Sequence, residues 1–262
     1  MIRLESSDYD RILPLLDHPT LALEPRSVAL GQSPGRILSE ERLEPTYALV
    51  HVIGMAGYYL AAKNPPASID DIRFSLSQET TTEDVEYLEI SACDPGLDET
   101  IARVLGNRAQ KSTNLIHRLS SLQPPTTDLA HTVPINRNLL ENPTFDLSPI
   151  VDTVSRYWTN MDAFLDLGVG ACVNHEGKTA VFCLSAFVVD DVHLLDIETS
   201  APLRQRVSVG PPVARAFSPS SNAVIRSSGV VCNPTPDPVG SSRDMGESAS
   251  KSTRYTSVGP LT

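Results

Sequence analysis

Residues 168–200 constrain the fold more than any other part of the chain. Three apolar, β-branched segments follow one another there: "VGACVNH", "TAVFCLSAFVV" and "VHLLDIETS". The first two are joined by a tight "HEGK" turn and the last two by "DD", connections short enough to join only antiparallel neighbours. This pattern predicts a three-stranded antiparallel meander. The segment "SPIVDTVSRYW" before it predicts a helix with Ser148 as N-cap and Pro149 at its first position.

Strand and helix patterns alternate in the first 121 residues. The segments "TYALVHVIGMAGYYLAAK", "EYLEISA" and "STNLIHRLS" favour strands, and "SVALGQSPGRILSEE" favours two short strands around a turn. Residues 8–17, "ASIDDIRFSL" and "LDETIARVLG" favour helices. The chain is therefore predicted to be α+β: a mixed, mostly antiparallel sheet flanked by helices, with an α+β companion domain at its N-terminus.

We expect a domain boundary at the polar, Pro-rich stretch "SLQPPTTDLAHTVP", which gives a companion domain over residues 1–130 and a core over 131–206. Residues 207–262 differ in composition. They contain 12 Ser, 7 Pro and 5 Gly, and a net charge of +2 replaces the −13 of the first 206 residues. This composition predicts loop or disorder for the segment.

Charge and cysteine usage exclude several classes of function. A net charge of −11 without a basic stretch argues against nucleic-acid binding. The longest apolar run, residues 47–62, is interrupted by His51, Gly54 and Gly57 and is not a membrane span. No Cys or His spacing fits a metal site, so Cys172 and Cys183 are expected to be buried free thiols. A cytoplasmic protein is the resulting expectation.

Residues 157–206 resemble the GNAT superfamily of acetyl-CoA-dependent N-acetyltransferases. The resemblance rests on Trp158 and Phe164 before "GVG", on "CLSAF", and on "IET" leading to the arginine-containing "RQR". The N-terminal segments "GRILSEERLEPTYALVHV" and "GYYLAAK" resemble the two-domain branch that includes zwittermicin-resistance-type proteins. The resemblance covers about residues 25–206. It implies acetyl-CoA as co-substrate and a small-molecule amine as acceptor.

The resemblance also implies where acetyl-CoA binds. The strand over residues 192–200 would pair through its backbone with the pantetheine arm, at Ile197 and Thr199. The loop that follows would hold the pyrophosphate with Arg204, Gln205, Arg206, Val207, Ser208, Val209 and Gly210. Such loops favour glycine, because a Cβ stands between the backbone N–H groups and the anion. Val207 and Val209 occupy the two positions where the family pattern has glycine.

Two residues are candidates for the catalytic base that deprotonates the amine. Glu198, near the end of the strand, is the first, and a solvated carboxylate is its alternative interpretation. His193, at the start of the strand, is the second, because an imidazole with a pKa of about 6.5 suits proton transfer at neutral pH. Regular pairing would place it on the opposite face from Glu198, and a bulge would alter this parity. Asp196 shares a face with Glu198 and could orient a substrate ammonium.

Two alternatives to an active enzyme remain. In one, the valines close the cofactor site and the chain is an inactive, GNAT-like binding module. In the other, the segment after Arg206 is translated in a disrupted frame and the chain is a truncated gene product. Codons for Val207, Ser208, Val209 and Gly210, read one base earlier, can encode Gly-Phe-Gly-Arg, which is a suitable pyrophosphate loop.

The frame hypothesis predicts a specific nucleotide sequence. In the DNA that encodes residues 206–212, a shift of one base should restore a Gly-x-Gly loop. Sequencing this region is the check, and a sequence in which no single-base shift does so contradicts the hypothesis.

Overall fold

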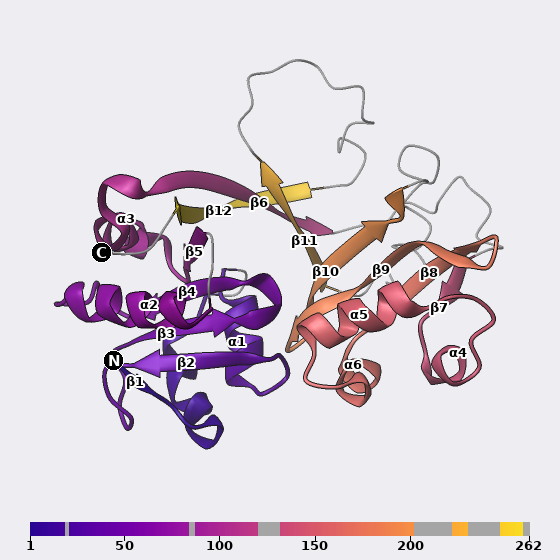
Figure 1. The fold of residues 1–262 in the computed structure, drawn as a ribbon, viewed down its shortest axis with the longest axis horizontal. Coiled ribbons are helices and arrows are strands. Elements are labelled where there is room, and N and C mark those ends of the chain that lie inside the picture. Colours follow the sequence, from indigo (N-terminus) through magenta and orange to yellow (C-terminus); the bar gives the residue numbers. More distant parts are fainter. Residues whose placement is uncertain (19–20, 84–86, 120–131, 202–221, 230–246, 259–262) are drawn as a thin grey trace, which may run out of the picture. The chain divides into compact units, whose positions relative to one another are not determined.

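The computed structural model describes residues 1–18, 21–83, 87–119, 132–201, 222–229 and 247–258 (Figure 1). The chain forms two compact units. The first comprises residues 1–116 with the later segments 227–233 and 250–262, and the second comprises residues 117–226 and 234–249. The later part of the chain thus contributes to both units.

In the first unit, two helices lie between the first two short strands of the chain. Its elements are β1 (Ile2–Arg3), the 3₁₀ helix η1 (Ser6–Leu15), α1 (Leu23–Ala29), β2 (Gly35–Ser39), β3 (Tyr47–Val52), η2 (Ile53–Met55), β4 (Gly57–Ala62), α2 (Asp70–Glu83), β5 (Tyr87–Ala92), η3 (Pro95–Leu97), α3 (Asp98–Leu105) and η4 (Gly106–Arg108). Two longer strands belong to it in part: β6 (Gln110–Leu119) and β12 (Glu247–Val258).

The strands of the first unit lie in the order β1-β2-β3-β4-β5-β12-β6. Strands β2, β3 and β4 form an antiparallel meander. Helix α2 follows in the chain, and β5 then returns parallel to β4, with Tyr58 opposite Ile90 and Leu60 opposite Ala92. A meander followed by one parallel strand is therefore the topology of this unit.

Alternating side chains make both faces of this sheet apolar, so helices cover both. Leu49, Leu60 and Ile90 on one face pack with Ile72 and Leu76 of α2 and with residues of α3. On the other face, α1 and η1 lie against β3. Gly35 shows how closely α1 approaches, because a Cβ there would lie 2.5 Å from a methyl group of Val28.

The second unit repeats this arrangement with different helices. Its elements are β7 (Thr132–Pro134), α4 (Arg137–Glu141), α5 (Ser148–Tyr157), α6 (Met161–Leu167), β8 (Gly170–His175), β9 (Lys178–Val189), β10 (Val192–Thr199) and the first part of β11 (Asn222–Gly229). Their order in the sheet is β11-β10-β9-β8-β7. Strands β8, β9 and β10 form an antiparallel meander, and β11 is parallel to β10.

The meander predicted for residues 168–200 is confirmed. Its first turn uses positive φ angles at Glu176 and Gly177, and its second uses one at Asp190. Trp158 and Phe164 are core residues, 2% and 1% exposed, with their rings 5.7 Å apart. The prediction that Cys172 and Cys183 are buried free thiols is also confirmed.

Two local predictions were wrong. Residues 27–29, predicted as part of a strand, belong to helix α1, in which Glu24 and Val28, one turn apart, are both buried. Ser148 does not cap α5. Asp146 accepts hydrogen bonds from the Ser148 backbone N–H (2.9 Å) and hydroxyl (2.7 Å). Within residues 207–262, predicted as largely loop or disorder, residues 222–229 and 247–258 form strands β11 and β12, and the rest lies outside the described residues.

Helix α5 packs across the meander of the second unit. Its Tyr157 ring lies 5.3 Å from the ring of Phe187 on β9. The indole N–H of Trp158, at the end of α5, donates a 2.8 Å hydrogen bond to the Ser185 carbonyl. These contacts fix α5 over one face of β9 and β10. Among the described helices, none is both long and apolar enough to cross a membrane.

Candidate active site

Strands β10 and β11 separate part of the way along their length. Parallel pairing extends from Val192 opposite Asn222 to Leu195 opposite Ile225. Strand β10 continues to Thr199, and these last four residues have no partner in the described part of β11. We call the Leu195–Ile225 pair and the following residues Asp196–Thr199 the branch point. Beyond it, one edge of β10 presents backbone donors and acceptors that an extended ligand can pair with.

A bulge beside the branch point sets which side chains share a face. The register between β9 and β10 shifts between Leu194 and Leu195, so that Ala186 on β9 has no opposite residue. Because the extra residue lies on β9, β10 keeps its regular alternation. His193 therefore shares a face with Ile197 and Thr199, and Asp196 shares the other face with Glu198.

His193 is held by Ser185 on β9. The Ser185 hydroxyl lies 3.0 Å from the His193 Nδ1 and also accepts a 3.1 Å hydrogen bond from the Val169 backbone N–H. Burial lowers the pKa of His193, and the nearby Asp191 carboxylate opposes this effect. The lowered pKa favours the neutral imidazole, and a fully buried serine holds its position.

The carboxylates lie on the face that α5 covers. Glu198 is about half exposed, and its Oε1 is 3.7 Å from a guanidinium nitrogen of Arg156 on α5. Asp196 is more buried, and its Oδ2 has no hydrogen-bond partner. Burial, followed by repulsion from Glu198, raises the pKa of Asp196, whereas Arg156 acts in the opposite direction. An acidic pair with one cationic neighbour therefore lines this face.

The structure does not bring the two predicted bases together. Glu198 and His193 lie on opposite faces of β10, one beside α5 and the other against Ser185. Ile197 and Thr199 lie beyond the last pair that β10 forms with the described part of β11. Residues Arg204, Gln205, Arg206, Val207, Ser208, Val209 and Gly210 lie outside the described residues.

Sequence reasoning missed two features of the site. Arg156 was not singled out, because its contact with Glu198 depends on how α5 packs on the sheet. The parallel strand β11 was missed because its residues, "NAVIRSSG", lie in a segment rich in Ser and Pro. In the described residues, no group of three or more His, Cys, Asp or Glu is arranged to hold a metal ion.

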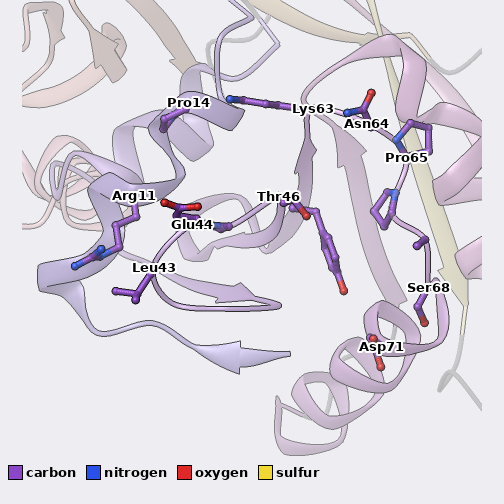
Figure 2. A pocket seen from close by; sticks show the side chains of 14 residues that line it. Arg11, Pro14, Leu43, Glu44, Thr46, Lys63, Asn64, Pro65, Ser68 and Asp71 are labelled. Atoms are coloured by element: carbon purple, nitrogen blue, oxygen red, sulfur yellow. The ribbon is translucent and has the colours of Figure 1, made fainter.

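The first unit contains a pocket of about 860 Å³ (Figure 2). Figure 2 shows Lys63 and Asn64 on one side, Arg11 and Leu43 on another, and Asp71 near the start of α2. The pocket is lined by Arg11, Pro14, Leu43, Glu44, Pro45, Thr46, Tyr47, Lys63, Asn64, Pro65, Pro66, Ala67, Ser68 and Asp71. Four lining prolines offer no N–H group, and the anionic Glu44 and Asp71 offset the cationic Arg11 and Lys63. These features do not suit a pyrophosphate.

Comparison with known proteins identifies the class to which this fold belongs. Residues 26–207 match the family model for GNAT acetyltransferases. The chain therefore belongs to the GNAT acetyltransferase family. Among proteins with curated descriptions, none matches it in sequence.

Solved structures of similar fold cover nearly the whole chain. A GCN5-related N-acetyltransferase-like protein from Streptococcus suis superposes with a TM-score of 0.60 at 15% identity, over 97% of this chain and 99% of that chain. A GCN5-related N-acetyltransferase from Kribbella flavida gives 0.52 at 12% identity, over 97% and 95%. A tandem GNAT protein from the clavulanic acid biosynthesis pathway gives 0.57 at 10% identity, over 99% and 98%. At these identities the similarity concerns the fold.

Ser185 provides a test of the site's architecture. Replacing it with Ala leaves the Val169 N–H without an acceptor, and the Ser185→Ala variant should lose about 1–3 kcal/mol of unfolding free energy. Urea unfolding of both proteins measures this difference. The control is Ser155→Ala on the exposed side of α5, where Ser155 bonds only the Val151 carbonyl. Its effect should stay within about 0.5 kcal/mol. Equal losses in the two variants would contradict the structural role of Ser185.

Proposed function

We propose that the chain transfers an acetyl group from acetyl-CoA to a small-molecule amine by direct attack. The observation that carries the proposal is the branch point, where β10 extends beyond its pairs with the described part of β11, in a chain of the GNAT acetyltransferase family. An extended pantetheine arm can add to this edge as a further strand, pairing with backbone groups at Ile197 and Thr199. Backbone N–H groups there would also polarise the thioester carbonyl.

The reaction needs no covalent enzyme intermediate. The neutral amine attacks the thioester carbon, a C–N bond forms, the C–S bond breaks, and the CoA thiol leaves. A base must first remove a proton from the acceptor's ammonium group, and Glu198 and His193 are the two candidates predicted from the sequence. The acidic face formed by Asp196 and Glu198 supports a cationic acceptor, because it attracts an ammonium group.

The pyrophosphate would be held by the segment Arg204–Gly210. Val207 and Val209 would limit how closely its backbone approaches the phosphates. The match to the family model ends at residue 207, which supports the proposal that the chain departs from the family pattern there. Either an altered cofactor loop or a disrupted reading frame accounts for this departure. The narrower placement in the zwittermicin-resistance-like branch and a cytoplasmic location stay predictions.

Calorimetric titration tests the proposal. Acetyl-CoA titrated into the 262-residue chain should bind one molecule per chain with a micromolar Kd. S-acetylpantetheine, which lacks the pyrophosphate, separates the two parts of the site. If the Arg204–Gly210 loop contributes, acetyl-CoA should bind at least about tenfold tighter, which corresponds to 1.4 kcal/mol.

Two outcomes distinguish the alternatives. Equal, weak binding of the two compounds would mean that the strand edge contributes to binding and the loop does not. No binding of acetyl-CoA at about 1 mM, weaker than about −4 kcal/mol, would contradict the acetyltransferase proposal and favour the inactive binding module or the truncated product.

A further inference from the structure

Asp196 lies at the point where β10 stops pairing with β11. It directly follows the Leu195–Ile225 pair, which is the last pair between β10 and the described part of β11. The residue as a whole is half-buried. Its Oδ2 is shielded from solvent and has no hydrogen-bond partner among the described residues. A shielded carboxylate oxygen without a donor is costly, because burial removes the water that would otherwise solvate it.

The groups that face Asp196 leave its negative charge incompletely balanced. Arg156 and Tyr157 approach from α5, Glu198 is two residues further along β10, and Cys183 lies on β9. In the part of the chain that the structure describes, Arg156 is the single cation among them, and it is ion-paired with Glu198 at 3.7 Å. Two carboxylates thus share one guanidinium. A second positive charge at Asp196 would complete the pairing.

Glu198 is less suited to receive that charge. Its carboxylate is about half exposed and already has Arg156 as its partner. A solvated, paired carboxylate gains little from a further cation, because water screens the interaction. Asp196 would gain more, since its oxygen is shielded and lacks a donor.

We propose that Asp196, and not Glu198, receives the ammonium group of the acceptor and removes one of its protons. This inference rests on the proposed acetyltransferase function and names its base and the charge of its substrate. The proton moves from the ammonium nitrogen to the Asp196 carboxylate. The amine then attacks the thioester carbon, and its second proton goes to the departing thiolate. Asp196 later releases its proton to solvent, so one proton is released per acetyl group transferred.

The protonation behaviour of Asp196 supports this role. Burial and the neighbouring Glu198 raise the pKa of Asp196, while Arg156 and the backbone N–H of Ile197 lower it to a smaller extent. A base is more effective when its pKa is nearer to the working pH. Because the ammonium group stabilises the ionised carboxylate, a bound cation should lower this pKa, and removal of the Glu198 charge should also lower it.

Nuclear magnetic resonance of the full chain tests the inference without acetyl-CoA. The Ile197 amide reports the charge of Asp196 because it hydrogen-bonds to that carboxylate. In the unmodified protein, the pH inflection of this amide should lie above that of a free Asp side chain. n-Butylammonium at ten times its Kd should move the inflection down by about one pH unit through linkage, and 1-butanol should not move it.

Two isosteric variants assign the effect to one carboxylate. Asp196→Asn should abolish both the inflection and the response to n-butylammonium. Glu198→Gln should retain the response, starting from a lower inflection. An inflection that n-butylammonium leaves unchanged in the unmodified protein would overturn the inference. A response lost in Glu198→Gln but kept in Asp196→Asn would overturn it as well.

Acetyl transfer from acetyl-CoA to 1-aminobutane gives a second readout. Loss of a general base should lower kcat of Asp196→Asn by about 100-fold or more and flatten its acidic pH limb. Glu198→Gln keeps the Asp196 carboxylate and only lowers its pKa, so its loss of kcat should be at least about tenfold smaller than that of Asp196→Asn. The reverse order would overturn the inference. If acetyl-CoA itself does not bind, the proposed function fails, and the resonance experiment still decides whether Asp196 binds an ammonium group.

The Asp196→Asn variant should fold. Asparagine has the same shape, and it removes a buried charge that costs stability at any pH above the pKa of Asp196. Its melting temperature at pH 8 should therefore equal or exceed that of the unmodified protein. A lower melting temperature would mean that the ionised carboxylate stabilises the fold. This result would contradict the proposal that Asp196 is an unpaired carboxylate that binds the ammonium group of the acceptor.

Discussion

The parallel pairing of β10 with β11, and its end at Leu195, is the constraint on which the site depends. Two strands that remained paired to their ends would satisfy each other's backbone groups and leave nothing for a ligand. After four residue pairs, β10 continues next to an acidic face without further pairs to the described part of β11. The meander holds β10 in place from its other side through the β9 register, and the bulge at Ala186 determines which side chains meet Ser185. The proposed cofactor-binding edge and the candidate catalytic residues therefore lie in one short segment of β10.

The two units of the chain share a topology, but they differ in how far the two parallel strands remain paired. Both consist of an antiparallel meander followed by a strand parallel to its last member. In the first unit, the pairing of β4 with β5 reaches Ala92, the last residue of β5, and the Cys93 N–H continues it by bonding the Leu60 carbonyl at 2.9 Å. Only Ala61 and Ala62 of β4 extend beyond its pairs with β5, so the first unit offers a shorter open edge than β10 does. Its pocket lies beyond β4, with prolines and carboxylates where a phosphate site needs N–H groups. On this evidence the second unit is the better candidate for the acetyl-CoA site.

The parts of the fold that could be predicted were those with strong local signals. The alternation in residues 170–199 and the two tight turns fixed the meander, and the apolar face of Ile150, Val154 and Tyr157 fixed α5. Three features depend on partners distant in sequence and could not be read locally: the parallel placement of β11, the β9 bulge and the burial of Asp196. Glu198 was preferred as the base from its position alone. Its exposure and its partner Arg156 emerge only when α5 is packed on the sheet. The internal repeat was also missed, because the two units share topology without an evident repeat of sequence.

Hydrogen–deuterium exchange in the presence and absence of acetyl-CoA tests most directly whether the branch point is the cofactor site. If the pantetheine arm pairs with the free edge of β10, backbone amides within Asp196–Thr199 should exchange more slowly when acetyl-CoA is bound. Amides in β4 and β5 of the first unit should be unchanged. Protection confined to the first unit, or binding without protection of Asp196–Thr199, would contradict the assignment of the acetyl-CoA site to the branch point.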